Sequence, residues 1–162
     1  MLRRWRIKRT HSGTFRFGLA DEERAVLRQL LPQLRELVLT PPEAADERVR
    51  RLFPTAYPED PEKDAEYQRL MRDELVQSRV AAIDRVEASL DSTELTEAEL
   101  IGWIQSVNAV RLVLGTMLDV SEDEQIEDVA SRLTADDPAL HDYALYGYLS
   151  ALLDEMVTVL GD

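Results

Sequence analysis

The sequence predicts a mainly α-helical protein, a helical bundle of about five to six helices with an N-terminal β-hairpin packed on it. Three observations support this fold class: long segments with apolar residues at helical spacing, capping residues and prolines between those segments, and few glycines. The chain has 162 residues and contains no internal repeat. Because this length is typical of one domain, we expect a single helical domain over residues 1–162.

A basic hairpin arm is predicted at residues 1–18. Residues 4–9 and 14–17 alternate apolar and basic side chains, and the turn residues His11, Ser12 and Gly13 lie between them. We expect the apolar face to dock on the helices, because a lone hairpin is marginally stable in water. That face carries Trp5, Ile7, Phe15 and Phe17, and the outward face carries Arg4, Arg6, Lys8 and Arg16.

The first two long helices are predicted from caps and prolines. The first covers residues 21–39, with Asp21 as its cap and with Pro32 kinking or dividing it. A short helical piece at residues 46–53 and a proline-rich connector follow. The second helix covers residues 61–90, with Asp60 as cap and Pro61 in its first position. Its apolar stripe is expected to run along the whole helix through Tyr67, Leu70, Met71, Leu75, Ala82, Val86 and Leu90.

The remaining helices start at similar signals. A capping box of Thr96 and Glu99 opens a helix over residues 97–119, and its broad apolar surface predicts the central position in the bundle. A second capping box, Ser121 with Glu124, predicts a short acidic helix. Asp137 followed by proline predicts the last helix, over residues 138–160.

Charge is distributed unevenly along the chain. The net charge is −13, yet residues 1–17 hold six basic residues and no acidic one. A basic arm on an acidic body has two interpretations that the sequence leaves open. The arm is either an interaction surface or a segment that lies against the acidic face of its own protein.

Several classes of chemistry find no support in the sequence. Cysteine is absent, which excludes disulfides, thiolate metal sites and a thiol switch within this chain. His11 and His141 lack metal-ligand spacing, and the acidic residues 119–128 lack the pattern of a calcium loop. No nucleophile motif or phosphate loop occurs. We expect no catalytic residue, no cofactor and no metal, and the lack of a long apolar segment predicts a cytoplasmic protein without membrane contact.

Two groups of residues are candidate sites. The first is the basic hairpin, because two-stranded ribbons can enter a DNA groove and basic side chains contact phosphates. The acidic body would repel the phosphates of DNA, which leaves a protein partner as the alternative. The hairpin is therefore a candidate contact for either nucleic acid or a protein partner. The candidate contact residues are Arg3, Arg4, Arg6, Lys8, Arg9 and Arg16.

The second group is a candidate buried polar clamp, Asn108 with Arg111, three residues apart on the predicted central helix. A buried arginine needs an acceptor, for which Asp73, Asp154 and Glu155 are candidates. A clamp that fixes helix register is the preferred interpretation, and a ligand site is the alternative. On the last helix, Gly147 and Ala151 permit close helix approach, within the monomer or in a homodimer.

Several segments together resemble a family. They are LFPTAY at residues 52–57, DPEKDAEY at 60–67, DEL at 73–75 and WIQSVNAVRLVLGT at 103–116. Trp5 in a basic start and the helix at residues 143–153 fit the same pattern. With these segments the chain resembles an actinobacterial domain of unknown function whose family includes the oxidative-stress transcriptional regulator AosR.

The resemblance implies a cytoplasmic bacterial regulator, encoded near a Clp protease adaptor and a sulfur-carrier route to cysteine. It implies no catalytic residues. A non-enzymatic regulatory protein linked to stress and cysteine metabolism is therefore expected, with a protein–protein interaction or adaptor module without DNA binding as the alternative. Because this chain has no cysteine, it departs from regulators that sense oxidation through disulfides.

Overall fold

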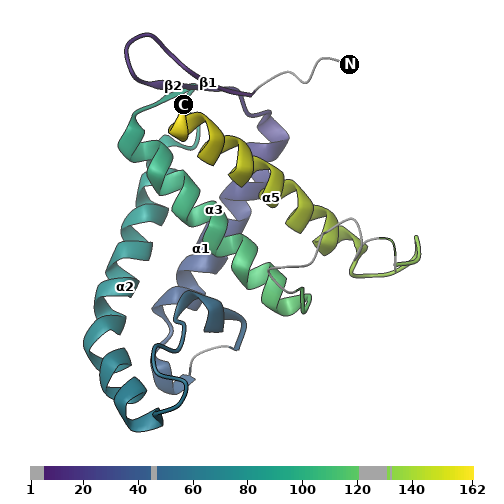
Figure 1. Ribbon diagram of the computed structural model, residues 1–162. Coiled ribbons are helices and arrows are strands. Elements are labelled where there is room, and N and C mark those ends of the chain that lie inside the picture. The colour runs from purple at the N-terminus through teal and green to yellow at the C-terminus, as the bar shows by residue number, and fades with distance from the viewer. Residues whose placement is uncertain (1–5, 45–46, 121–130, 132) are drawn as a thin grey trace.

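Four α-helices and a small sheet form the described part of the computed structural model, which covers residues 6–44, 47–120, 131 and 133–162. Figure 1 shows the helices side by side with the sheet across one end of the bundle, which confirms the predicted fold class. The helices are α1 (Asp21–Leu39), α2 (Pro61–Ser89), α3 (Glu97–Met117) and α5 (Leu140–Gly161). Two short 3₁₀ helices, η1 (Pro42–Ala44) and η2 (Glu47–Leu52), join α1 to the proline-rich connector. Trp5 and the capping box of Ser121 with Glu124 lie outside the described residues.

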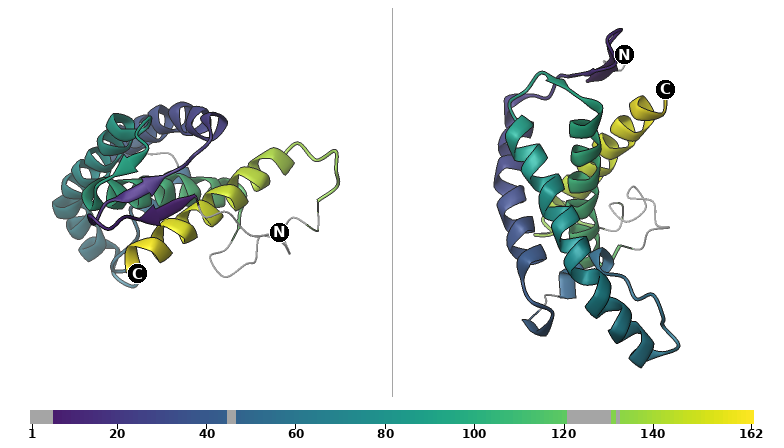
Figure 2. Two further views of the ribbon diagram at one scale, coloured as in Figure 1. Left: turned by 90° about the horizontal axis from the view of Figure 1, so that it is seen from above. Right: turned by 90° about the vertical axis from the view of Figure 1, so that its left-hand side faces the viewer.

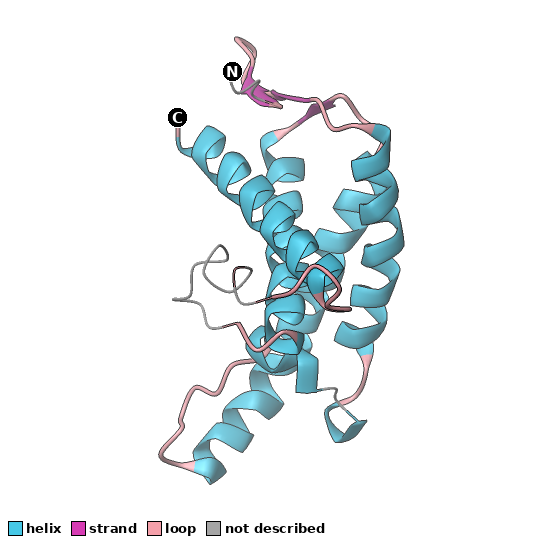
Figure 3. Ribbon diagram, turned by 90° about the vertical axis from the view of Figure 1, so that its right-hand side faces the viewer, coloured by secondary structure: helices cyan, strands magenta, loops and turns pink. Residues whose placement is uncertain are grey.

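The predicted hairpin is part of a three-stranded antiparallel sheet in the order β1 (Ile7–Arg9), β2 (Phe15–Phe17) and β3 (Glu94–Leu95). Ile7 lies opposite Phe17, and Phe15 lies opposite Leu95. The sequence did not predict β3, which is two residues long and lies between two long helices. Gly13 has a φ of 86° in the hairpin turn, where a side chain would be strained. Figure 3 shows the strands at the end of the bundle where α5 terminates.

Helix α1 starts differently from the prediction. Its N-cap is Ala20, and Asp21 is the first helical residue. The Glu23 carboxylate accepts a hydrogen bond from the Ala20 backbone N–H at 2.7 Å, so an acceptor three residues later satisfies the helix start. Pro32 lies within α1 and does not divide it. The first helical turn still gains from three acidic residues near its positive end.

Helix α2 begins as predicted, with the Asp60 side chain accepting a hydrogen bond from the Lys63 N–H at 3.1 Å. Its apolar stripe is buried only in the second half, at Ala82, Ile83 and Val86. Leu70 is 68% exposed, so the predicted full-length buried stripe is wrong at this position. The right-hand view of Figure 2 shows the cause: the first turns of α2 project beyond the other helices, with the connector beside them.

Helix α3 is the central helix, packed against α2, α5 and η2. Its predicted capping box is present, since Thr96 accepts from the Glu99 N–H at 3.2 Å and donates its own N–H to Glu99 at 2.9 Å. Trp103 is fully buried, and its ring meets that of Phe17 edge-on at a centroid distance of 4.7 Å. This helix is long and apolar enough to span a membrane, but 56% of its most apolar stretch is buried within the bundle. Packing in the core therefore explains its apolar composition.

Helix α5 starts at Leu140, two residues later than predicted. The reason is a turn before the helix, in which the Asp137 carboxylate accepts a hydrogen bond from the Ala139 backbone N–H at 2.8 Å. Its C-terminal end lies beside β1. The left-hand view of Figure 2 shows β1 and β2 crossing above the helices next to this end of α5. The sheet, which contains the first two elements of the chain, is therefore packed against the last helix.

Candidate functional site

The outward face of the sheet carries fewer free basic groups than the sequence predicts. Lys8 lies directly opposite Arg16, and both residues are exposed. Arg16 in turn lies opposite Glu94 on β3, so an acidic residue adjoins the basic pair. This face is therefore a short row of two cations and one anion.

Arg6 and Arg9 contact their own protein. Arg6 forms an ion pair with Glu23, and its guanidinium lies 5.7 Å from the centre of the Tyr148 ring. Arg9 donates to the Leu160 carbonyl oxygen at 3.0 Å, where α5 ends with free carbonyl groups. Arg3 and Arg4 lie outside the described residues. All four described candidates are exposed, and Lys8 and Arg16 differ from Arg6 and Arg9 in that no side-chain contact within the described residues engages them.

The edge of β1 is also covered by the protein itself. One carboxylate oxygen of Glu155 accepts the backbone N–H groups of Arg6 at 2.7 Å and Ile7 at 3.3 Å. Tyr148 lies on the same helix, and burial raises the pKa of its phenol. This end of α5 is thus a docking surface for the chain's own basic segment.

Asn108 and Arg111, the predicted buried clamp, contact each other but are half-buried, and Arg111 has a further partner on α5. Arg111 donates to the Asn108 side-chain oxygen at 3.1 Å and to the Tyr146 hydroxyl at 3.2 Å. Asp73, Asp154 and Glu155 were the expected acceptors, but the partners of Arg111 among the described residues include no carboxylate. Tyr146 is a buried residue of α5, and its hydroxyl links Arg111 of α3 to that helix.

A buried arginine that the sequence analysis missed is Arg24 on α1, which is 7% exposed. Its three guanidinium nitrogens donate to the backbone carbonyl groups of Leu19, Leu90 and Phe17. Arg24 therefore joins β2, the start of α1 and the end of α2. Its spacing three residues before the apolar Leu27 was the available signal, but polar side chains at such positions usually reach solvent.

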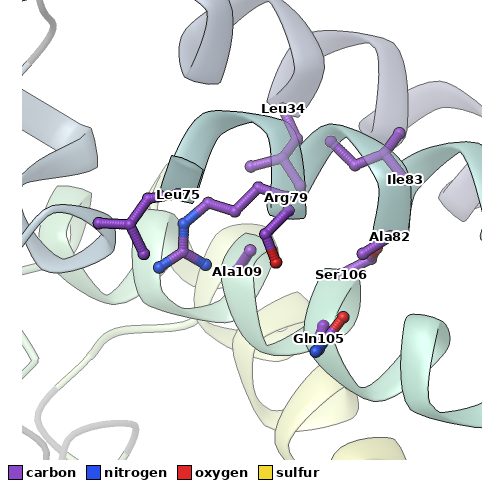
Figure 4. Close-up of a pocket in the computed structure, with 9 residues that line it drawn as sticks. Leu34, Leu75, Arg79, Ala82, Ile83, Gln105, Ser106 and Ala109 are labelled. Carbon is purple, nitrogen blue, oxygen red and sulfur yellow. The ribbon is translucent and has the colours of Figure 1, made fainter. Parts of the chain in front are cut away.

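A second missed arginine, Arg79 on α2, lines a cavity between α1, α2 and α3. Figure 4 shows Leu34, Ile83 and Ala109 around this space, with the Arg79 guanidinium extended between Leu75 and Ala109. Arg79 donates to the Leu52 carbonyl oxygen at 2.7 Å. Burial lowers the pKa of Arg79, which means that desolvation of its charge is not offset by a nearby carboxylate.

Metal binding finds no support in the described part of the chain, where no group of three or more histidine, cysteine or acidic residues is arranged to hold an ion. His11 and His141 are both exposed and lie on separate elements. The acidic residues 121–128 are outside the described ranges.

These features define a class of protein: a small helical bundle that anchors a basic N-terminal segment with its last helix and holds one buried and two half-buried arginines between its elements, Arg24, Arg79 and Arg111. The chain belongs to the family of the domain of unknown function DUF2017, whose family model matches residues 2–160.

Relatives with an assigned name occur in mycobacteria. The chain is 28% identical to the oxidative stress regulator AosR of Mycobacterium bovis and to that of Mycobacterium tuberculosis. Each match covers 99% of this chain and 88% of the relative. No solved structure matches the chain significantly.

Proposed function

We propose that this protein is a cytoplasmic, non-enzymatic regulatory protein that acts by binding a macromolecular partner. The observation that carries the proposal is the similarity to a named oxidative stress regulator over 99% of the chain. The similarity supports the proposal because it extends over nearly the whole chain. The regulatory link to stress and to cysteine metabolism is part of this proposal.

A protein partner is favoured over DNA by the arrangement of charges. Arg6 and Arg9 are engaged within the protein, and Arg16 adjoins Glu94. Outside residues 1–17 the chain has 13 basic and 32 acidic residues, which would repel phosphates approaching the body. Lys8 and Arg16 are the exposed basic residues of the described sheet that an acidic partner would contact, and Arg3 and Arg4 precede them in the sequence.

Direct binding to DNA is the second candidate, because Lys8 and Arg16 form an adjacent exposed pair on a two-stranded ribbon. Fluorescence anisotropy with duplex DNA at about 50, 150 and 300 mM salt distinguishes the candidates, since phosphate contacts make affinity fall steeply with salt. The comparison uses wild type, a Lys8→Gln, Arg16→Gln variant, and an Arg50→Gln, Arg69→Gln control. The control removes the same charge from exposed positions away from the sheet.

We expect no DNA binding at about 150 mM salt and a protein partner recovered from the native cells by tagged wild type and by the control variant. Loss of that partner in the Lys8→Gln, Arg16→Gln variant would place the contact on the sheet. DNA binding that survives this salt concentration and disappears in the same variant would instead establish the DNA candidate.

The regulatory role itself has a separate test. Deletion of the gene should change transcript levels under oxidative stress, including those for cysteine biosynthesis, and the wild-type gene should restore them. Unchanged transcripts would refute the regulatory role. Sensing by a thiol within this chain is excluded by its composition, so the trigger acts through a partner or another group.

Self-association is a further part of the proposal. Gly147 is half-buried and Ala151 is exposed on α5, so this small-residue side of the helix is available for close approach by a second helix. Sedimentation velocity of wild type and of an Ala151→Glu variant tests the homodimer. A monomer at all concentrations would remove it from the proposal.

A further inference from the structure

The cavity between α1, α2 and α3 has a volume of about 140 Å³. Apolar side chains of all three helices form its walls, including Leu34, Ile83 and Ala109. Ser78 and Gln105 are exposed residues at its margin, so the cavity communicates with solvent. Cavities of about 150 Å³ accommodate a molecule the size of benzene, which has about six non-hydrogen atoms.

Two polar groups in this cavity lack partners. The Arg79 Nε and the Ser106 hydroxyl are buried and make no hydrogen bond to any described residue, and Ser106 is only 2% exposed. Buried polar groups are almost always paired, because a donor without an acceptor loses its hydrogen bond to water on burial and gains none in exchange. Donors that line one cavity and remain unpaired indicate a ligand that supplies acceptors.

Arg24 shows how this protein satisfies an arginine with a purely structural role. Each of its three guanidinium nitrogens donates to a backbone carbonyl group. Arg79 is half-buried, and its contacts among the described residues are one hydrogen bond to Leu52 and a position 5.9 Å from the Phe53 ring centre. The Arg79 charge is therefore neither paired with a carboxylate nor fully hydrogen-bonded.

We propose that this cavity binds a small monocarboxylate of about six non-hydrogen atoms, such as butyrate. Its carboxylate accepts hydrogen bonds from Arg79 and Ser106, because an anion compensates the guanidinium and provides acceptors for both donors. Its carbon chain packs against Leu34, Ile83 and Ala109. The ligand needs a charged end to pair with the two donors and an apolar end to fill the rest of the cavity. This binding site is independent of whether the macromolecular partner is a protein or DNA.

Titration of the ¹⁵N-labelled protein with sodium butyrate tests the proposal by NMR. We expect saturable shifts of backbone amide signals at residues 78–83 and 105–109, with a Kd of about 1 mM, the range open to so small a ligand. Butyramide, a neutral molecule of equal size, should bind at least about tenfold more weakly because it lacks the charge. Sodium chloride at matched ionic strength controls for general salt effects.

Two variants test the named donors. Arg79→Met keeps an unbranched apolar stem and removes the guanidinium group with its charge, and it should weaken butyrate binding about tenfold or more. Ser106→Ala removes one donor and should weaken it severalfold. Arg28→Met is the control, because Arg28 forms an exposed ion pair with Asp91 away from the cavity. Amide spectra of each variant without ligand establish that the fold is retained.

Three results would overturn the proposal. They are an absence of saturable shifts at residues 78–83 and 105–109, equal affinity for butyrate and butyramide, and unchanged butyrate affinity in folded Arg79→Met or Ser106→Ala. If Arg79→Met fails to fold, the Ser106→Ala affinity and the comparison with butyramide decide the outcome.

Discussion

The Trp103 indole N–H on α3 donates a hydrogen bond to the Ser89 hydroxyl at the end of α2, with a distance of 2.8 Å. Both residues are buried, and Trp103 also contacts Phe17 of the sheet. The pair therefore lies where two helices and the sheet meet. Ser89→Ala would leave the indole N–H buried without an acceptor.

We expect Ser89→Ala to lower the free energy of unfolding by about 1–3 kcal/mol, the cost of an unsatisfied buried donor. Urea denaturation should show a lower midpoint with an unchanged slope. Ser78→Ala, an exposed serine on the same helix, serves as the control. Equal stability of Ser89→Ala and wild type would contradict this account of the junction.

Arg24 should be more important for stability than an exposed arginine on the same helix. Arg24→Met removes three hydrogen bonds to buried carbonyl groups and should cost about 2–4 kcal/mol. Arg28→Met loses an exposed ion pair with Asp91 and should cost less than about 1 kcal/mol. Calorimetric unfolding of both variants provides the measurement. The interpretation fails if the two variants are equally stable.

Glu155 should protect the edge of β1. Glu155→Ala removes the acceptor of two backbone N–H groups, so hydrogen exchange of the Arg6 and Ile7 amides should accelerate about tenfold or more. Asp154→Ala changes the adjacent exposed residue and should leave these rates within about twofold. Unaltered exchange in Glu155→Ala would show that the hairpin docks without this carboxylate.

Gly115 should resist a larger side chain. A Cβ atom there would lie 3.0 Å from Arg51 Nη1 and 3.1 Å from a ring carbon of Tyr146, and Tyr146 is buried. Gly115→Ala should therefore destabilise the protein by about 1–2 kcal/mol despite the better helix propensity of alanine. Gly161→Ala, where a Cβ would meet nothing within 4 Å, should be neutral or slightly stabilising. Thermal unfolding compares the two, and a stabilised Gly115→Ala would contradict the packing at this position.

The half-buried phenol of Tyr148 should make the stability of the protein fall at alkaline pH. Burial raises the pKa of its phenol above the ordinary value of about 10, so the unfolded chain loses this proton first as the pH rises. The contribution is complete below about pH 10 and is lost as the pH increases through the raised pKa of the folded protein. Urea midpoints at pH 8, 9.5 and 10.5 should fall less steeply for Tyr148→Phe than for wild type. An equal fall of the urea midpoint with pH in wild type and in Tyr148→Phe would contradict the prediction.

Local signals account for the parts of the fold that the sequence predicted. The cap at Asp60, the capping box at Thr96 and the alternation at residues 14–17 all involve interactions between near neighbours. β3 was missed because two residues are too few to show a period, and its pairing with β2 joins residues about 80 positions apart. The exposure of Leu70 was missed because periodicity identifies an apolar face without revealing whether another helix covers it.

The candidate sites depended even more on long-range contacts. The sequence identified Arg111 as a residue that needs an acceptor, but charge alone directed attention to carboxylates, and the acceptor is the hydroxyl of Tyr146. The basic arm was visible in the composition. That Arg6 and Arg9 bind Glu23 and the end of α5 required the tertiary structure.

The contacts between β1 and α5 also determine the order in which the protein can be completed during synthesis. Arg6 and Ile7 leave the ribosome well before Glu155 and Leu160, the residues on α5 that contact them and Arg9. The hairpin can pair with itself early, but the edge of β1 has no acceptor until α5 has emerged. A nascent chain therefore carries an open strand edge until α5 has been synthesised, and chaperones or other nascent chains can reach that edge before this helix closes it.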